Sequence, residues 1–368
     1  MKQEHRNIML FVTVFVLALL ISVSCAPKAT PASPTPTTAP VARTSTPESG
    51  GTASAPGKVI ELKFSTFQSP QHYIVKNVHN RWAQEVEART KGRVKVTMYY
   101  AESLGKAAVH YEMLSTGIAE AGLFLPSYTQ GRFPLTGIVE IPFYGDAVKA
   151  TRSITDLFNM HLYREYPEIK MLYIVAPPID IGVKKPVKTM EELKGLKIRT
   201  TGGYVTKTLE ALGATPVTMP VTEIYTSMER GVVDGFTINY NSWPGYKLQE
   251  VSKNVIVAGF STPLNIQGMN INTWKSLPPD IQKIIDGVNT DATQWWLDAT
   301  AAENTNAVDI MQKAGVNIYY LPDAERARWK EKVKPLWDEW EKDVNAKGLS
   351  GTKVRADFEV ILKKYGVQ

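Results

Sequence analysis

The sequence predicts an α/β fold built in two lobes, and three features of the chain lead to this prediction. Strand and helix patterns alternate over residues 59–125, and the alternation begins again near residue 170, which is typical of α/β proteins. A helical pattern without an internal proline then covers residues 280–314, and it is longer than most helices of globular proteins. The chain has 368 residues, enough for two domains of about 150 residues each.

The first alternation marks the beginning of the folded part. Residues 59–66 alternate apolar and polar side chains as a strand does. Ser69 and Pro70 then supply an N-cap and a first-turn proline for a helix that ends at Gly92. Strand, helix and strand patterns follow at residues 94–98, 106–116 and 121–125. Strands separated by helices in this way are predicted to be parallel.

The second alternation and the C-terminal region complete the predicted fold. Strand patterns occur at residues 170–176, 197–200, 215–219 and 232–238, with helix patterns at 203–212 and 222–231. Two more strands are predicted near residues 254–258 and 267–271, and helices at 323–347 and 354–365. The long helical pattern at 280–314 is predicted to span both lobes.

The N-terminal segment has the pattern of a secretory signal. Lys2 and Arg6 precede an apolar run at residues 8–23, which is short for a membrane-spanning helix and fits a signal peptide over residues 1–24. Small residues then precede Cys25, the only cysteine of the chain. This arrangement is typical of a bacterial lipoprotein, in which the thiol carries lipid, and ordinary signal cleavage is the alternative. Both place the mature chain outside the cytoplasmic membrane, in the periplasm or at the cell surface.

Residues 25–57 are predicted to form a tether between a lipid anchor and the folded part. Of the 32 residues from Ala26 to Gly57, 28 are Pro, Thr, Ala, Ser or Gly. Such a segment lacks the apolar side chains needed to build a core.

Composition and motifs exclude several classes of function. The formal charge is +6, but acidic and basic residues are interleaved, so no nucleic-acid partner is expected. With Cys25 as the sole cysteine, the folded part has no disulfide, cysteine-based zinc site or cysteine nucleophile. Catalytic and nucleotide-binding motifs are absent from the sequence, and the five histidines form no zinc-ligand pattern. The chain is therefore predicted to be a binding protein rather than an enzyme, without a metal or cofactor.

Arg199 is the candidate that stands out on physical grounds. It ends a predicted short strand and precedes a turn and a helix that begins within residues 201–204. Ligands of two-lobed α/β proteins bind at the carboxyl ends of strands, and a guanidinium matches the geometry of a carboxylate. Free backbone N–H groups near Thr201 would favour an anion as well. From these residues alone, an exposed arginine without a ligand remains equally open.

Four motifs resemble the solute receptors of TRAP (tripartite ATP-independent periplasmic) transporters. They are EELKGLKIR at residues 191–199, LGATPVTMP at 212–220, EIYTSMERGVVDG at 223–235 and WKSLP at 274–278. The resemblance covers residues 59–368. It implies a periplasmic-binding-protein-like clamshell that closes on a small organic acid, pairs the carboxylate with Arg199 and delivers the acid to TRAP membrane subunits. A sensory receptor and an extracytoplasmic enzyme on the same fold are the alternatives.

The resemblance also implies how the chain divides between the lobes. We expect residues 58–176 plus 263–305 to form lobe I. Residues 177–262 plus 306–368 are expected to form lobe II.

The predicted ligand site combines one arginine with mostly apolar or aromatic neighbours. Many receptors of this family carry a second arginine where this chain has Ile179 or Asp180. The ligand is therefore predicted to be a monocarboxylate with an apolar or aromatic body. For Tyr240 and Trp243, plain core packing is an equal alternative. Besides Arg199, the predicted ligand-binding residues are Phe67, Phe124, Thr201, Ile238, Asn239, Tyr240 and Trp243.

Overall fold

The computed structural model describes residues 58–141 and 143–367. The predicted signal peptide at 1–24, Cys25 and the predicted tether up to residue 57 lie outside these described residues. Within the described part, none of the helices has the length and apolar character needed to cross a membrane.

A first sheet contains five strands in the order β2-β1-β3-β10-β4. Their bounds are β1 (Ile60–Ser65), β2 (Val94–Tyr99), β3 (Ala121–Phe124), β4 (Ile169–Val175) and β10 (Asn265–Asn270). As predicted, β1 is parallel to both β2 and β3. The later strand β10 is antiparallel to β3 and β4, because the chain enters it directly from the other sheet and not through a helical crossover.

A second sheet contains six strands in the order β11-β9-β5-β8-β6-β7. The bounds are β5 (Ile179–Val183), β6 (Lys197–Thr200), β7 (Thr215–Thr218), β8 (Gly235–Ile238), β9 (Asn254–Ser261) and β11 (Asn317–Tyr320). Strand β6 is parallel to β7 and β8, whereas β5 is antiparallel to β8 and β9. The carboxyl ends of β6, β7 and β8 therefore lie along one edge of this sheet.

Two short segments connect the sheets. Residues 176–178 lead from β4 to β5, and residues 262–264 lead back from β9 to β10. Pro177, Pro178 and Pro263 lie in these segments, where proline restricts the backbone without removing a bond from either sheet.

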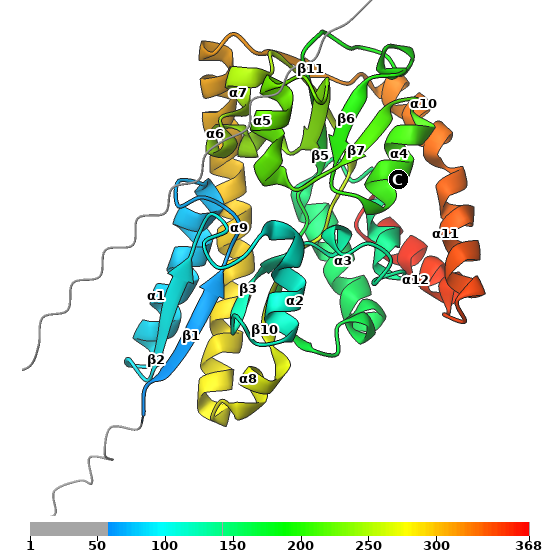
Figure 1. Ribbon diagram of the computed structural model, residues 1–368. Coiled ribbons are helices and arrows are strands. Elements are labelled where there is room, and N and C mark those ends of the chain that lie inside the picture. Colours follow the sequence, from blue (N-terminus) through cyan, green and yellow to red (C-terminus); the bar gives the residue numbers. More distant parts are fainter. Residues whose placement is uncertain (1–57, 142, 368) are drawn as a thin grey trace, which may run out of the picture. The chain divides into compact units, whose positions relative to one another are not determined.

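Helices surround both sheets (Figure 1). The α-helices other than α9 are α1 (Asn80–Arg89), α2 (His110–Ser115), α3 (Ala147–Met160), α4 (Gly203–Ala211), α5 (Ile224–Glu229), α6 (Trp243–Tyr246), α7 (Leu248–Val251), α8 (Ile271–Ser276), α10 (Asp323–Val333), α11 (Pro335–Ala346) and α12 (Gly351–Lys364). Short helical segments are η1 (Val75–His79), η2 (Ala107–Val109), η3 (Pro126–Tyr128), η4 (Thr136–Glu140), η5 (Leu162–Glu165), η6 (Glu191–Leu193), η7 (Val221–Glu223) and η8 (Tyr240–Ser242).

The long helix α9 (Pro279–Lys313) spans 35 residues and runs beside both sheets, as Figure 1 shows. It contacts β4 of the first sheet and β11 of the second. Trp82 of α1 donates from Nε1 to Asn289 Oδ1 of α9 at 2.8 Å, and Phe64 packs on the Trp82 ring at 5.4 Å between centroids. Burying an aromatic side chain of this kind contributes about 1.5–3 kcal/mol. The prediction of one helix that spans both lobes is confirmed.

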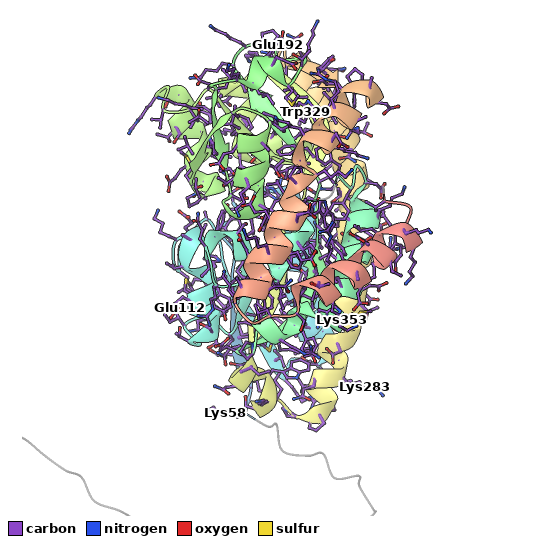
Figure 2. All side chains as sticks on the ribbon, turned by 90° about the vertical axis from the view of Figure 1, so that its right-hand side faces the viewer. Lys58, Glu112, Glu192, Lys283, Trp329 and Lys353 are labelled. Atoms are coloured by element: carbon purple, nitrogen blue, oxygen red, sulfur yellow. The ribbon has the colours of Figure 1, made fainter. Side chains whose placement is uncertain are left out.

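The last three helices lie on one face of the folded part, where Figure 2 labels Trp329 on α10 and Lys353 on α12. Helices α10 and α11 contact α4, whereas α12 packs on α3. His161, just after α3, lies 2.6 Å from Asp357 of α12 between Nε2 and Oδ2. The C-terminal segment thus contacts residues of both predicted lobes, and the exact lobe boundaries remain a prediction.

Candidate functional site

A cavity lies where both sheets, both connecting segments and α9 come together. The space not filled by atoms, including the open mouth of the cavity, is about 640 Å³. The lining residues are Phe67, Gln68, His72, Tyr73, Ile74, Leu123, Leu125, Tyr128, Val175, Pro177, Ile179, Arg199, Thr201, Val221, Thr237, Ile238, Asn239, Ser242, Tyr246, Pro263, Asn265, Gln267 and Trp296.

Arg199 occupies this cavity as a buried side chain with 1% of its surface exposed. It lies on β6, and the ends of the two neighbouring strands hold its guanidinium. Nε donates to the carbonyl oxygen of Met219 at 2.8 Å, just after β7. Nη1 donates to the carbonyl oxygen of Thr237 at 2.9 Å, at the end of β8. The parallel strands thus position the guanidinium at their shared carboxyl edge.

The Arg199 charge has no anionic partner among the described residues, since its hydrogen bonds go to two carbonyl oxygens and one phenol oxygen. Burial lowers the pKa of Arg199 and the neighbouring Tyr128 opposes this shift, but a guanidinium stays charged in proteins. Of its five N–H groups, three make these bonds, which leaves one hydrogen on each terminal nitrogen. Two donors on a planar fork match the two oxygens of a carboxylate.

Tyr128 joins Arg199 from the other sheet and was missed by the sequence analysis. It ends η3, which directly follows β3. Its hydroxyl accepts from Arg199 Nη2 at 3.2 Å and from the backbone N–H of Val221 at 3.0 Å. With both acceptor positions occupied, the hydroxyl hydrogen is left to donate. Its place after the carboxyl end of β3 matches that of the predicted site residue Phe67, which follows the end of β1.

Four other predicted site residues line the cavity with Arg199. They are Phe67, Thr201, Ile238 and Asn239. The Thr201 hydroxyl is buried and has no hydrogen-bond partner among the described residues. The Asn239 amide nitrogen donates to Ser242 Oγ at 2.7 Å and also to Asn241 Oδ1, so both of its amide hydrogens are engaged within the protein.

Phe124 lies outside the cavity, contrary to the sequence-based expectation. Successive side chains of a strand point to opposite faces, and the neighbouring Leu123 and Leu125 are the ones that line the cavity. Phe124 instead packs edge-on against Tyr111, with ring centroids 5.3 Å apart, and at a tilted angle against Tyr166, with centroids 6.0 Å apart.

Tyr240 and Trp243 also lie outside the cavity. Trp243 is fully buried and packs on Phe236 of β8 with ring centroids 5.1 Å apart. Tyr240 lines a separate hollow and donates its backbone N–H to Asp180 Oδ2 at 3.2 Å. The short helix η8 turns the chain so that Ser242 lines the cavity in their place. For Trp243, the structure therefore fits core packing, which was the alternative to a place in the ligand site.

No second cation stands at the position expected from the resemblance. Ile179 lines the cavity, while Asp180 accepts from the backbone N–H groups of Ala258 and Gly259 at 2.9 and 3.1 Å. His72 also lines the cavity, and burial lowers its pKa to about 3, so its imidazole is neutral. Among the described lining residues, Arg199 is therefore the one that carries a charge. No group of metal-ligating side chains occurs in the described part of the chain.

Two sheets, a spanning helix and a cavity with one charged residue among its described lining residues, Arg199, fit the class of solute-binding proteins. The chain belongs to the bacterial extracellular solute-binding protein family 7, which matches residues 64–343. A C4-dicarboxylate-binding periplasmic protein of Rhodobacter capsulatus is 28% identical over 306 residues, which cover 80% of this chain and 90% of that protein. The resemblance to TRAP solute receptors is thereby confirmed.

Solved structures of TRAP solute-binding proteins share the fold. One from Rhodoferax ferrireducens, in complex with copurified benzoate, is 28% identical with a TM-score of 0.79, covering 84% of this chain and 99% of that one. Another from a marine metagenome is described as specific for aromatic acid ligands and contains metahydroxyphenylacetate. It is 26% identical with a TM-score of 0.76, covering 83% of this chain and 99% of that one. The predicted two-lobed α/β class is confirmed.

Proposed function

We propose that this chain is the extracytoplasmic receptor of a TRAP transporter, which captures a small organic acid and delivers it to the membrane permease. Its family membership supports the receptor role. The observation that carries the ligand chemistry is the buried Arg199 guanidinium, which has no anionic partner among the described residues. Removing an unpaired charge from water is costly, so an anionic ligand is the natural partner.

The carboxylate of the acid binds to the two free N–H groups of Arg199. The Tyr128 hydroxyl, already oriented by Arg199 and Val221, donates a further hydrogen bond. Thr201, whose hydroxyl is buried without a partner in the described structure, supplies another. Because the Arg199 side chain is buried, the attraction between guanidinium and carboxylate is stronger there than at an exposed site.

The body of the acid is apolar or aromatic, and the ligand carries one negative charge. Phe67, Tyr73 and Trp296 offer aromatic surface in the cavity. A second carboxylate would lose its hydration without meeting a second cation. The lack of a second cation therefore disfavours a dicarboxylate, the ligand class in the name of the Rhodobacter capsulatus relative. It favours an aromatic monocarboxylate such as the benzoate in the Rhodoferax ferrireducens structure.

The lobes enclose the ligand by a hinge motion. Lobe I comprises residues 58–176 plus 263–305 and lobe II residues 177–262 plus 306–368. The short segments at 176–178 and 262–264 serve as the hinge, since few residues there need to change their backbone angles. The receptor works outside the cytoplasmic membrane, attached through lipid on Cys25; mass spectrometry of the mature N-terminus tests this anchor.

A thermal-shift screen of benzoate, phenylacetate, succinate and the neutral compound benzamide tests the proposed ligand class. A ligand at about 100 times its Kd stabilises the folded state by about 2.7 kcal/mol. We expect benzoate or phenylacetate to raise the melting temperature and benzamide to leave it unchanged. Stabilisation by benzamide equal to that by benzoate would contradict the role of the carboxylate.

A further inference from the structure

Of the three carboxamide side chains that the first-sheet part of the chain contributes to the cavity wall, Gln68, Asn265 and Gln267, two have a buried oxygen without a partner among the described residues. Gln267 is on β10 and Gln68 follows β1. Gln267 is 1% exposed, and the Oε1 atoms of both glutamines are buried without a hydrogen-bond partner among the described residues. Unpaired buried polar atoms are uncommon in folded proteins, so a group that arrives with the ligand is a natural partner.

The strand register explains why Gln267 lines the cavity. It pairs directly with Leu123 of β3, and directly opposed residues of neighbouring strands point to the same face. Leu123 also lines the cavity. The carboxamide therefore belongs to the first-sheet wall, whereas Arg199 and its carbonyl partners belong to the second sheet.

His72 adds a donor to the same cavity without adding charge. Its Nδ1 accepts from the backbone N–H of Ile74 at 3.3 Å, which assigns the ring hydrogen of the neutral imidazole to Nε2. That Nε2 is buried and has no partner among the described residues. The cavity thus presents unpaired acceptors and an unpaired donor, all of them neutral.

We propose that the ligand is a monocarboxylate whose body carries a neutral hydrogen-bonding group, a hydroxyl above all, and that Gln267 and Gln68 recognise this group. The inference rests on the proposed function for the carboxylate end of the ligand. A hydroxyl both donates and accepts, so it can satisfy a carboxamide oxygen and an N–H donor together. A second carboxylate has only acceptors and would face the carboxamide oxygens without a cation.

The competing explanation for the buried Gln267 side chain is that it pairs with Tyr173 rather than with the ligand. Tyr173 is also the position of the matched control variant. Tyr173 lies on β4 and is the register partner of Gln267 on β10. Its buried hydroxyl also lacks a partner among the described residues. If Gln267 served only to pair with Tyr173, the ligand would be irrelevant to both. Tyr173 is not among the residues that line the cavity, so Tyr173→Phe removes a nearby hydroxyl without altering the proposed contact.

Calorimetry on the purified protein tests the proposal with benzoate, 3-hydroxybenzoate, 4-hydroxybenzoate and the diacid isophthalate. We expect at least one hydroxybenzoate to bind about tenfold or more tightly than benzoate, because a site built for a hydroxyl rejects the analogue without it. Isophthalate should bind more weakly than benzoate. Gln267→Met, similar in shape, should reduce the hydroxyl preference to less than about threefold, while Tyr173→Phe should keep it.

Gln68→Met is the second variant, so the test does not depend on the folding of Gln267→Met alone. Equal affinities for benzoate and both hydroxybenzoates would overturn the inference and leave the proposed receptor function intact. So would tighter binding of isophthalate, or a loss of preference in Tyr173→Phe as large as that in Gln267→Met. If none of the four acids bound, the proposed aromatic-acid ligand itself would fail.

Discussion

The two walls of the cavity, one contributed by each sheet, bury different kinds of polar side chain. The second-sheet wall buries a charged arginine, which carbonyl oxygens after β7 and on β8 hold in place. The first-sheet wall buries neutral carboxamides, with unpaired oxygen atoms at Gln68 and Gln267. Only the charged wall demands an ion as partner. We therefore propose that one wall determines that the ligand is an anion and that the other discriminates between anions.

Two buried charges of the second sheet show why Arg199 in particular marks the site. Asp180 accepts from three backbone N–H groups, those of Tyr240, Ala258 and Gly259. Backbone donors of this kind satisfy a carboxylate within the protein. The Arg199 guanidinium keeps two N–H groups without a partner among the described residues. Burial alone does not indicate a binding site; Arg199 differs from Asp180 because it is a buried charge whose hydrogen bonds are incomplete among the described residues.

The largest effect is expected from removing the charge of the second-sheet wall. Arg199→Ala should weaken acid binding by about 2–5 kcal/mol, because the ligand carboxylate would be buried without a partner. Arg199→Lys should recover only part of the affinity, since an ammonium lacks the planar fork. Calorimetry measures both, with the exposed Arg93→Ala as control. Unchanged affinity in Arg199→Ala would remove the proposed carboxylate site.

The next effect concerns Tyr128, which links the two walls. Tyr128→Phe keeps the ring and its edge contact with Phe67, whose centroid is 6.0 Å away. It removes the hydroxyl that accepts from Arg199 Nη2 and that we propose donates to the ligand. A hydrogen bond to a charged group is worth about 1.5–3 kcal/mol, so acid affinity should fall roughly 10- to 100-fold.

Tyr163→Phe, at a half-exposed ring outside the cavity, is the control for Tyr128→Phe. The same calorimetric titration applies to both variants. If the two variants bound the acid as tightly as each other, Tyr128 would have no part in the site.

A pH effect on stability is expected at Glu140, where η4 meets the first turn of α4. Glu140 of η4 accepts from the backbone N–H of Tyr204, in the first turn of α4, at 2.7 Å. Burial raises the pKa of Glu140 from 4.5 to about 8. Between these values the folded protein keeps a proton that the unfolded chain has released, so the free energy of unfolding should decrease as the pH rises from about 5 to about 8.

Glu140→Gln should flatten this pH dependence, which urea unfolding at several pH values measures. Burial also raises the pKa of Asp180, to about 6, so a smaller decrease below about pH 6 should persist in the variant. An identical slope in the variant and the unmodified protein would show that Glu140 does not hold the proton.

The smallest effect is the change of shape on binding. If the segments at 176–178 and 262–264 form a hinge, ligand that contacts both walls should favour the closed form. X-ray scattering should then give a smaller radius of gyration with saturating acid than without it. Equal profiles, with binding verified by calorimetry, would mean that the two walls do not move relative to each other.

Local sequence patterns were sufficient to identify cavity residues that lie at or just after the carboxyl end of a strand. Arg199 and Thr201 follow from β6 and the turn before α4, and Phe67 follows from the end of β1. Phe124 shows the limit of this reasoning. A position at the carboxyl end of a strand does not specify which face the side chain occupies, and the register with β10 directs Leu123 toward the cavity.

The sequence by itself determined the α/β class, the family and the long helix, because these depend on periodicity and on contiguous motifs, and it predicted Arg199 as the carboxylate-binding residue. It also predicts the secretory signal and Cys25, which lie outside the described residues. Only the tertiary structure decided which residues face Arg199 from the first sheet. Tyr128, Gln68 and Gln267 are far from Arg199 in the sequence. They reach one cavity because the chain passes between the sheets three times, at two short segments and along α9. Such long-range neighbours leave no local pattern, so the contrast between a charged and a neutral wall arises only on folding.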